Sequence, residues 1–387
     1  MPPPTPLRHP ARRVCVVLLT GLGDVVHGLP LVTALKRDDP ERHVTWVAEP
    51  MPAQILDPHP AVDQVVRYRR RDGWRGVVAL RRALREARRR APGGGFDLTL
   101  NLNVYFKAAW PVLFSGAPHR LGFERGRAKD GVWLASNHHL PPGPRRHTQD
   151  MFLEFLAYLG VPFAPPSAPA DWGITFTSDE RRAQHEWVAE RSGRPRAALV
   201  PASAVAAKDW PPERWAAVAD VLAGDHGYEV VLAGGPGARE TAAARAVADA
   251  ARHPPTWAMG DGVRRLAWVL DASALVLAPD TGPLHIARAL GRPVVGLFGH
   301  TNPWRVGPYR AFEELWVDAY TEPGAEPDAS RFDPPPGDRM AAITVDAVLG
   351  RVARAVARYG RRDGAPDGAP GGVGGAPGAA AGGGHAD

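Results

Sequence analysis

The segment 279–308, PDTGPLHIARALGRPVVGLFGHTNPWRVGP, constrains the fold more than any other part of this sequence. It follows an apolar run and contains a turn at 280–282, a helical pattern over 283–290 and a second apolar run at 294–298. This order predicts a strand, a tight turn, a helix and a parallel strand. Such a helix begins at the carboxyl end of a strand, where free N–H groups and the helix dipole favour an anion such as a diphosphate.

The same alternation of short apolar runs and helical patterns recurs along the chain. At 387 residues the chain is long enough for two domains. Strands are expected at 14–19, 43–48, 62–68, 96–102, 197–200, 229–233, 274–278 and 294–298. Helices are expected at 24–36, 74–90, 149–159, 212–223, 240–251, 266–270, 283–290 and 343–359. The pattern predicts an α/β fold with two Rossmann-like, doubly wound domains facing each other across a crevice.

Composition places the boundaries of these domains. We expect a disordered arm at 1–12, an N-terminal domain at 13–160, a Pro-rich linker at 161–172, a C-terminal domain at 173–342, an amphipathic helix at 343–359 and a disordered Gly/Ala/Pro tail at 360–387. The start of the chain has a short apolar stretch without a small-residue cleavage site, so we interpret it as an arm and a first strand, not as a signal peptide.

The charge and cysteine content narrow the class of protein. The net charge of +6 favours an anionic partner without naming it. No recognised nucleic-acid module is present, so we expect no nucleic-acid partner. The single cysteine, Cys15, excludes an internal disulfide framework and fits a reducing cytoplasm. No apolar run reaches the length of a membrane span.

Polar residues follow several strands of the second half, where a ligand of a parallel sheet would bind. Lys208 lies in the loop after 197–200, together with Ser203, and an ammonium group there suits a phosphate. Glu240 lies one turn into the helix that follows a glycine turn, where a carboxylate can accept a ribose hydroxyl. The alternatives are a solvated lysine and a favourable helix N-terminal charge. His285 lies one turn into the helix after 280–282 and can face the same crevice.

Asp24 ends the glycine turn after the first strand and has two interpretations. It is either the N-cap of the next helix, where Asp is favoured, or a carboxylate that takes a proton from an attacking hydroxyl. The glycine spacing does not match a full dinucleotide fingerprint, which disfavours a Rossmann oxidoreductase. We expect His27 to pack within the helix rather than to act as a catalyst.

Basic residues gather in the first half. The loop 122–130 alternates Arg125, Arg127 and Lys129, a pattern suited to an acidic acceptor, whereas the arginines of 81–90 are typical of a solvated helix face. His138, His139 and His147 have no Cys or carboxylate at metal-ligand spacing, so no metal site is predicted.

Four segments together resemble glycosyltransferase family 9, the heptosyltransferase family of lipopolysaccharide core assembly. They are LLTGLGDVVHGLP, PASAVAAKDWPPERW, LAGGPGARE and the signature segment that begins at Pro279. The resemblance covers nearly the whole chain between its two tails. It implies a GT-B fold, with the acceptor in the N-terminal domain and a nucleotide sugar in the C-terminal one. It also implies an inverting, metal-independent transfer without a cofactor.

The resemblance assigns roles to individual residues. It makes Asp24 the general base, Lys208 the diphosphate ligand and Glu240 the ribose contact. The full set of donor contacts expected is Ser203, Lys208, Glu240, Met259, Asp280, Thr281, Gly282 and His285. The acceptor contacts expected are Gly23, His27, Arg120, Arg125, Arg127 and Lys129.

The function expected is transfer of heptose from ADP-heptose to a core acceptor such as Kdo-lipid A or heptosyl-Kdo-lipid A. Three alternatives remain: a family member that uses another nucleotide sugar, a GT-B-fold nucleotide-sugar epimerase, and a non-catalytic protein that binds an anionic polymer. The partners implied are the donor and an acidic, lipid-linked saccharide. We expect a cytoplasmic monomer, with peripheral contact at the cytoplasmic face of the inner membrane.

Overall fold

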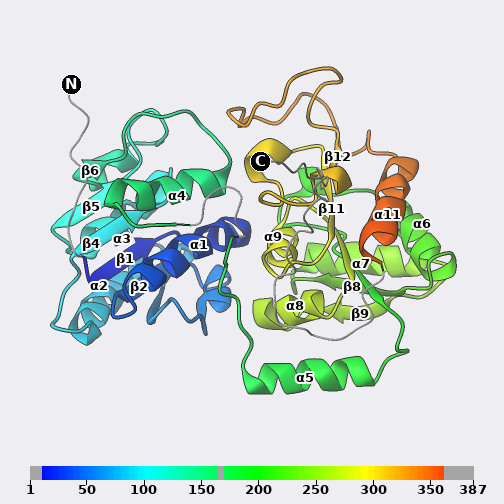
Figure 1. Ribbon diagram of the computed structural model, residues 1–387, viewed down its shortest axis with the longest axis horizontal. Helices are drawn as coiled ribbons and strands as arrows, with labels where there is room; N and C mark the ends of the chain where they lie inside the picture. The colour runs from blue at the N-terminus through cyan, green and yellow to red at the C-terminus, as the bar shows by residue number, and fades with distance from the viewer. Residues whose placement is uncertain (1–10, 164–169, 361–387) are drawn as a thin grey trace, which may run out of the picture.

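The computed structural model describes residues 11–163 and 170–360 and contains two α/β lobes that lie side by side (Figure 1). Each lobe is built around a six-stranded sheet, and all the paired strands in both sheets run parallel. The predicted α/β class with two doubly wound halves is therefore confirmed.

The first sheet has the strand order β3-β2-β1-β4-β5-β6. Its strands are β1 (Arg13–Val17), β2 (His43–Ala48), β3 (Gln64–Arg67), β4 (Leu98–Asn101), β5 (His119–Gly122) and β6 (His138–His139). The helices of this lobe are α1 (Leu22–Asp38), η1 (Pro52–Leu56), η2 (Arg70–Asp72), α2 (Gly73–Arg90), η3 (Phe106–Ala108), α3 (Ala109–Phe114), η4 (Val132–Ala135) and α4 (Thr148–Leu159), where η marks a 3-10 turn.

The second sheet has the order β12-β11-β10-β7-β8-β9. Its strands are β7 (Arg196–Leu199), β8 (Glu229–Gly234), β9 (Thr256–Met259), β10 (Leu275–Pro279), β11 (Val294–Phe298) and β12 (Val317–Asp318). The helices are α5 (Ser178–Ala189), η5 (Ala206–Lys208), α6 (Pro212–Gly224), α7 (Ala238–Ala250), α8 (Gly262–Asp271), α9 (Gly282–Ala289), α10 (Pro303–Val306), η6 (Glu313–Leu315) and α11 (Val345–Tyr359).

The two sheets have the same topology. Counted from the first strand of each, both follow the order 3-2-1-4-5-6, and the direction of winding reverses between the first and fourth strands. The central strands are buried on both faces, as the unbroken burial of β4, β7, β8, β10 and β11 shows. Ligands of such folds bind beyond the carboxyl ends of the strands at the point of reversal, which lies at β1 and β4 in one lobe and at β7 and β10 in the other.

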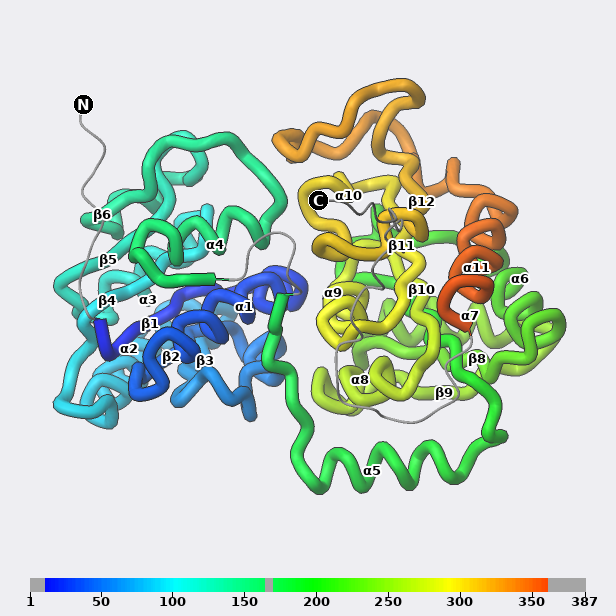
Figure 2. Tube along the Cα trace, in the orientation of Figure 1, coloured from blue at the N-terminus to red at the C-terminus, as the bar shows by residue number. Residues whose placement is uncertain are grey.

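The lobes contact each other through specific polar pairs as well as apolar packing. The Val263 N–H donates to Gln54 Oε1 at 2.8 Å, and the Tyr309 hydroxyl donates to Asp150 Oδ1 at 2.6 Å. The segment between β12 and α11 also reaches toward the first lobe (Figure 2). Phe332 of this segment packs against Lys129 and Arg145 of the first lobe. The two crevice walls are thus held against each other.

Three of the segments expected from composition lie largely outside the described residues. These are the arm at 1–12, the middle of the linker at 161–172 and the tail at 360–387. His138 and His139, for which the sequence gives no strand pattern, form the edge strand β6. The final helix begins at Val345, two residues later than expected, because Thr344 caps it through its side chain.

Candidate active site

Asp24 lies in the first turn of α1, after the carboxyl end of β1. The helix is capped by Gly21, at φ 75°, and no side-chain hydrogen bond caps it, so the interpretation of Asp24 as the N-cap is wrong. A Cβ on Gly21 would lie 2.4 Å from Asp24 Oδ2, because the carboxylate folds back over this glycine. The glycine turn therefore leaves room for the carboxylate at the crevice.

The surroundings of Asp24 suit a proton acceptor. Burial raises the pKa of its carboxyl, and the positive charges of Arg305 and Lys107 partly offset that rise. A carboxylate with a raised pKa accepts a proton from a substrate hydroxyl more readily than an ordinary one does.

In the second lobe, Lys208 of η5, Asp280 after β10 and His285 of α9 are linked in what we call the charged chain; Asp280 and His285 are buried, and Lys208 is partly exposed. Lys208 Nζ donates to Asp280 Oδ2 at 2.7 Å and to the Asp280 carbonyl at 3.1 Å. His285 Nε2 lies 3.1 Å from Asp280 Oδ1, and because a carboxylate only accepts, this nitrogen is the donor. Burial alone would raise the pKa of Asp280, but Lys208 and His285 hold it well below its usual range.

This chain leaves two groups available to a ligand. Lys208 has three N–H donors and uses two of them on Asp280. The Thr281 hydroxyl, at the N-cap of α9, is buried without a hydrogen-bond partner in the described part of the chain. Both lie at the head of α9, where the helix dipole favours negative charge.

The N-termini of α1 and α9 meet where the two lobes touch. A Cβ on Gly282 would lie 2.6 Å from the Leu22 side chain, and a Cβ on Gly23 would lie 2.4 Å from His285 Cδ2. Glycine at both positions lets the two helices approach this closely. The structure thus brings Asp24 of one lobe beside the His285 end of the charged chain in the other.

The remaining expected donor residues lie on neighbouring loops of the second lobe. Ser203 is buried, and its hydroxyl donates to the Val205 carbonyl while its N–H donates to Asp209. The Glu240 carboxylate lies over the glycine turn after β8, since a Cβ on Gly237 would lie 2.5 Å from its Oε2. Within residues 11–163 and 170–360 this carboxylate has no hydrogen bond or ion pair. Ser203 thus shapes its own loop, whereas Glu240 has its carboxylate available to a ligand.

Met259 ends β9 and is buried beside the same turn. Its methyl group would lie 2.9 Å from a Cβ on Gly234. This contact makes Met259 an apolar wall of the loop after β8.

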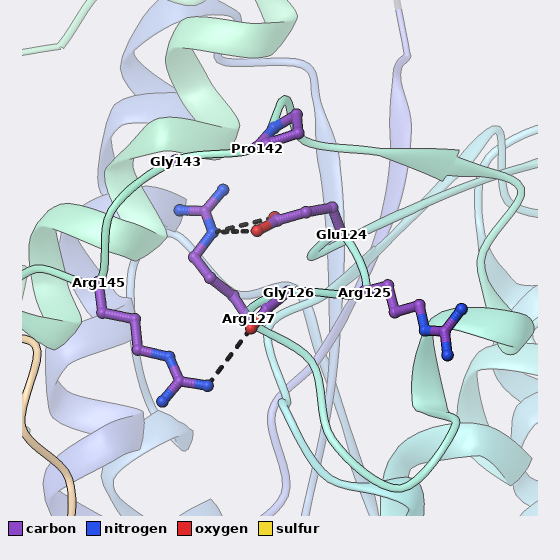
Figure 3. Close-up of a pocket in the computed structure, with 7 residues that line it drawn as sticks. All are labelled: Glu124, Arg125, Gly126, Arg127, Pro142, Gly143 and Arg145. Carbon is purple, nitrogen blue, oxygen red and sulfur yellow. Dashed lines mark hydrogen bonds and ion pairs between the residues drawn. The ribbon is translucent and has the colours of Figure 1, made fainter.

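The expected acceptor residues divide into exposed and internal ones. Figure 3 shows the pocket lined by the 124–127 and 142–145 segments, with the Arg127 side chain directed at Glu124. Arg127 is 4% exposed, and its guanidinium also binds Glu154 and the Pro141 carbonyl. It therefore holds the loop together through its side chain, and its contact with an acceptor stays a prediction.

Arg125, Lys129 and Arg120 differ from Arg127. Arg125 stacks on Trp133 with 5.6 Å between the guanidinium carbon and the ring centre, and Lys129 lies over the rings of Tyr105 and Phe332. Arg120 uses its guanidinium on the carbonyls of 117 and 135 at the start of β5. Of these three residues, only Arg120 donates hydrogen bonds from its charged group to backbone carbonyls in the described part of the chain.

His27 is internal as well. It is 3% exposed, and its ring packs between His285, with ring centres 4.4 Å apart, and His147, with ring centres 5.1 Å apart. Its Nδ1 lies 3.3 Å from Gln149 Oε1. The expectation that His27 packs is confirmed. Its Nε2 is buried without a hydrogen-bond partner among the described residues, and its place as an acceptor contact stays a prediction.

Two cations near Asp24 were not expected from the sequence. Lys107, on η3 after β4, donates from Nζ to the Thr20 hydroxyl, and its pKa is lowered by burial and raised in part by Asp24. Arg305, on α10 of the other lobe, has a buried Nε without a partner among the described residues. Lys107 follows the fourth strand of its sheet. Ligands of such folds bind where the winding of the sheet reverses, and this rule applied to the sequence predicts Lys107 as a site residue.

The described residues contain no group of three or more His, Cys, Asp or Glu side chains placed to hold a metal ion. None of the helices in 11–163 or 170–360 is both long and apolar enough to cross a membrane.

Comparison with known proteins identifies the family. The model of glycosyltransferase family 9 (heptosyltransferase) matches residues 77–325. The Haemophilus influenzae lipopolysaccharide core heptosyltransferase OpsX is 28% identical over 352 residues, covering 89% of this chain and 96% of the relative. The Pseudomonas aeruginosa lipopolysaccharide heptosyltransferase 1 is 30% identical over 313 residues, covering 77% and 81%. The chain belongs to glycosyltransferase family 9 and is a glycosyltransferase.

Solved structures agree on the fold. A family 9 glycosyltransferase from Veillonella parvula has a TM-score of 0.75 at 22% identity, covering 90% of this chain and 98% of its own. The Escherichia coli heptosyltransferase WaaC with ADP has a TM-score of 0.67 at 24% identity, covering 89% and 99%. The fold is of the GT-B type, as the resemblance predicted.

Proposed function

We propose that this enzyme transfers heptose from ADP-heptose to a lipopolysaccharide core acceptor, Kdo-lipid A or heptosyl-Kdo-lipid A, with inversion at the anomeric carbon. The observation that carries the proposal is the contact of Gly23 with His285, which brings the Asp24 carboxylate to the donor turn. The names of the relatives support the choice of sugar and acceptor, since lipopolysaccharide heptosyltransferases recur among them.

The donor diphosphate is proposed to bind at the head of α9. The free N–H of Lys208 and the Thr281 hydroxyl would hold phosphate oxygens, and the dipole of α9 would offset the charge that develops on the departing ADP. Glu240 would accept a ribose hydroxyl from its position over the glycine turn. No metal is needed for these contacts, because the protein supplies the positive charge.

Asp24 is proposed to start the transfer. Its carboxylate takes the proton of the acceptor hydroxyl while the hydroxyl oxygen bonds to the anomeric carbon and the bond from that carbon to the phosphate oxygen breaks. ADP leaves with the electron pair of that bond. Attack from the face opposite ADP inverts the configuration.

The acidic acceptor is proposed to meet cations from both lobes. Lys107 and Arg305 flank Asp24, and Arg125 and Lys129 lie farther out on the first lobe. A carboxylate of the acceptor would be attracted by these charges, and Arg305 and Lys107 also favour the ionised form of Asp24. We propose a cytoplasmic monomer that contacts the inner membrane peripherally to reach this lipid-linked substrate.

Titration calorimetry with ADP, UDP and GDP tests the donor site. We expect ADP to bind more tightly than UDP or GDP, and Lys208→Ala to weaken ADP roughly tenfold or more, as expected for loss of a charge-assisted hydrogen bond. Lys36→Ala is the matched control, since Lys36 forms a similar ion pair with Asp63 at 3.0 Å on the first lobe.

Three results would change the proposal. Preference for UDP or GDP would replace heptose by another sugar while keeping the glycosyltransferase. Conversion of ADP-heptose in the absence of an acceptor would favour an epimerase. No binding of any nucleotide, with salt-sensitive binding of an anionic polymer, would contradict the donor site altogether.

A further inference from the structure

Large apolar side chains are exposed on one part of the first lobe. Seven of the eleven exposed large hydrophobic residues in the described part of the chain fall between 74 and 134. Trp74 and Leu134 are the most exposed, at 75% and 78%. We define the α2–α3 face by six of the seven: Trp74, Val78, Phe106, Trp110, Leu113 and Leu134.

The elements that carry these residues are neighbours. Helix α3 packs against α2, against η3 and against η4. Both α2 and α3 connect strands in the same direction across the sheet, so right-handed crossovers place them on the same side of it. Helix α1, which meets the second lobe at α9, connects strands in the opposite direction and lies on the other side. The α2–α3 face is therefore free of the contact between the lobes.

The exposed side of α2 combines this apolar surface with positive charge. Gly76, Leu80, Leu84 and Ala87 are buried against the lobe and fix the orientation of the helix. Trp74, Val78, Arg81 and Arg85 then follow one exposed stripe at helical spacing.

The arginines of this stripe are not neutralised. The helix has one acidic residue, Glu86, and it pairs with Arg89 and Arg90. In the part of the chain that the structure describes, Arg81 and Arg85 have no acidic partner. The stripe thus presents tryptophan, valine and unpaired arginine to the solvent on a rigid helix.

Exposed tryptophan and leucine beside unpaired arginine match the chemistry of an anionic bilayer surface. The rings insert among the headgroups, and the guanidinium groups meet lipid phosphates. A nucleic acid would bind the positive charge but would leave the leucine and valine side chains without apolar contacts. A protein partner would have to place acidic groups opposite the arginines. The charge and the aromatic content favour lipid.

The α2–α3 face also borders the active site. Phe106 is 51% exposed on η3, and the next residue, Lys107, donates to Thr20 four positions before Asp24. A bilayer in contact with this face would therefore lie close to Lys107, whose charge acts on Asp24. A saccharide anchored in that bilayer would reach Asp24 without leaving it.

We propose that the α2–α3 face docks the enzyme on an anionic lipid bilayer and so holds the first lobe, with Asp24, close to a lipid-linked acceptor in that membrane. The inference rests on the proposed function, because the proposed lipid-linked acceptor is what the enzyme would reach by docking on a membrane. The face itself is defined by exposure and charge, so its binding can be measured without any saccharide.

Co-sedimentation of the full chain with vesicles tests the docking. Vesicles of phosphatidylethanolamine with phosphatidylglycerol should bind the protein, and binding should weaken with added salt, whereas phosphatidylcholine vesicles should bind it much less. Trp74→Ser should weaken binding several-fold. Trp257→Ser is the matched control, because Trp257 is an exposed tryptophan on β9 of the second lobe, 42% accessible.

The charge is tested by a paired substitution. Arg81→Ser with Arg85→Ser should weaken vesicle binding about tenfold or more, at about fivefold for each arginine near a bilayer. The same change at Arg182 and Arg194, which are exposed on the second lobe, should leave binding unchanged. Equal losses in the two pairs, or no binding of the unaltered protein to anionic vesicles, would overturn the proposal.

Two readouts separate this inference from the proposed function. None of the substitutions on the α2–α3 face should change ADP binding by calorimetry or transfer to a deacylated, water-soluble acceptor. Transfer to the soluble acceptor without vesicle binding would overturn the docking surface alone. Vesicle binding without transfer would leave the surface standing and contradict the proposed function.

Discussion

Gly23 of α1 and His285 of α9 meet where the two lobes touch, and a Cβ on Gly23 would lie 2.4 Å from His285 Cδ2. The contact joins the proposed base to the proposed donor site through a position that has no room for a side chain. The account therefore predicts that one methyl group at this position disturbs both halves of the reaction.

Gly23→Ala should lower transfer roughly tenfold or more, because the added carbon forces His285 or α1 to move and overpacking of this kind costs about 1–3 kcal/mol. Gly350→Ala is the matched control, since Gly350 lies in α11 with open space around it. That change should keep activity and raise the free energy of unfolding by about 0.5–1 kcal/mol. Full activity of Gly23→Ala would show that the close approach is not required.

Lys107→Gln should alter the pH dependence of transfer. Lys107 lowers the pKa of Asp24 by its charge, so its removal should raise that pKa further. The base acts when ionised, so activity is lost as pH falls through the pKa of Asp24. The acidic limb of the rate profile should therefore move to higher pH in the variant, and the KM for the acceptor should rise.

Lys36→Gln provides the control for this profile, because Lys36 pairs with Asp63 away from the crevice. ADP affinity should be unchanged in both variants. An unmoved acidic limb in Lys107→Gln would contradict the proposed influence of Lys107 on Asp24.

His147 should make the stability of the protein depend on pH. Burial lowers its pKa to about 4, and it caps α4 by accepting the Gln149 N–H while donating to the Gly307 carbonyl of the other lobe. Because the folded pKa lies below the unfolded value of 6.5, the unfolded state binds the proton more tightly between these values. The free energy of unfolding is therefore not reduced by His147 above pH 6.5. It falls as the pH drops from 6.5 toward 4, by up to about 3 kcal/mol.

His147→Asn keeps an acceptor for the helix cap and removes the titrating ring. Denaturant unfolding at several pH values should show a shallower loss of stability at low pH in this variant than in the unaltered protein. His185→Asn, at an exposed position of α5, should leave the slope as it is. An unchanged slope in His147→Asn would exclude His147 as its source.

The fold could be predicted from the sequence because its longer helices and strands show a clear hydrophobic periodicity. The runs at β1, β2, β8, β10 and β11 and the patterns of α1, α2 and α11 are strong signals, and their alternation specifies a parallel sheet. The edge strands β6 and β12 have two residues each, too few to show the alternation of apolar and polar residues that identifies a strand. Helix α5 was overlooked although Thr177 and Glu180 form a capping box, because its face toward the second lobe buries only two residues.

The candidate site was predictable where chemistry follows a strand end. Lys208, Asp280 and His285 form the charged chain because the loops after β7 and β10 meet at the reversal of the second sheet. Arg127 could not be separated from Arg125 by pattern alone, since both lie within three residues of Glu124 and the second carboxylate that binds Arg127, Glu154, lies on α4, distant in sequence. Lys107 was missed because it stands among apolar residues after β4, with no glycine turn to mark it.

The central claim is that Asp24 deprotonates an acceptor hydroxyl beside a bound nucleotide sugar. It is tested most directly by transfer of labelled heptose from ADP-heptose to Kdo-lipid A and to heptosyl-Kdo-lipid A, with the unaltered enzyme and Asp24→Asn, and with ADP affinity measured in parallel. The account predicts transfer to one of these acceptors, a loss of about 10²–10⁴-fold in the variant, and unchanged ADP binding. Full transfer by Asp24→Asn would contradict it.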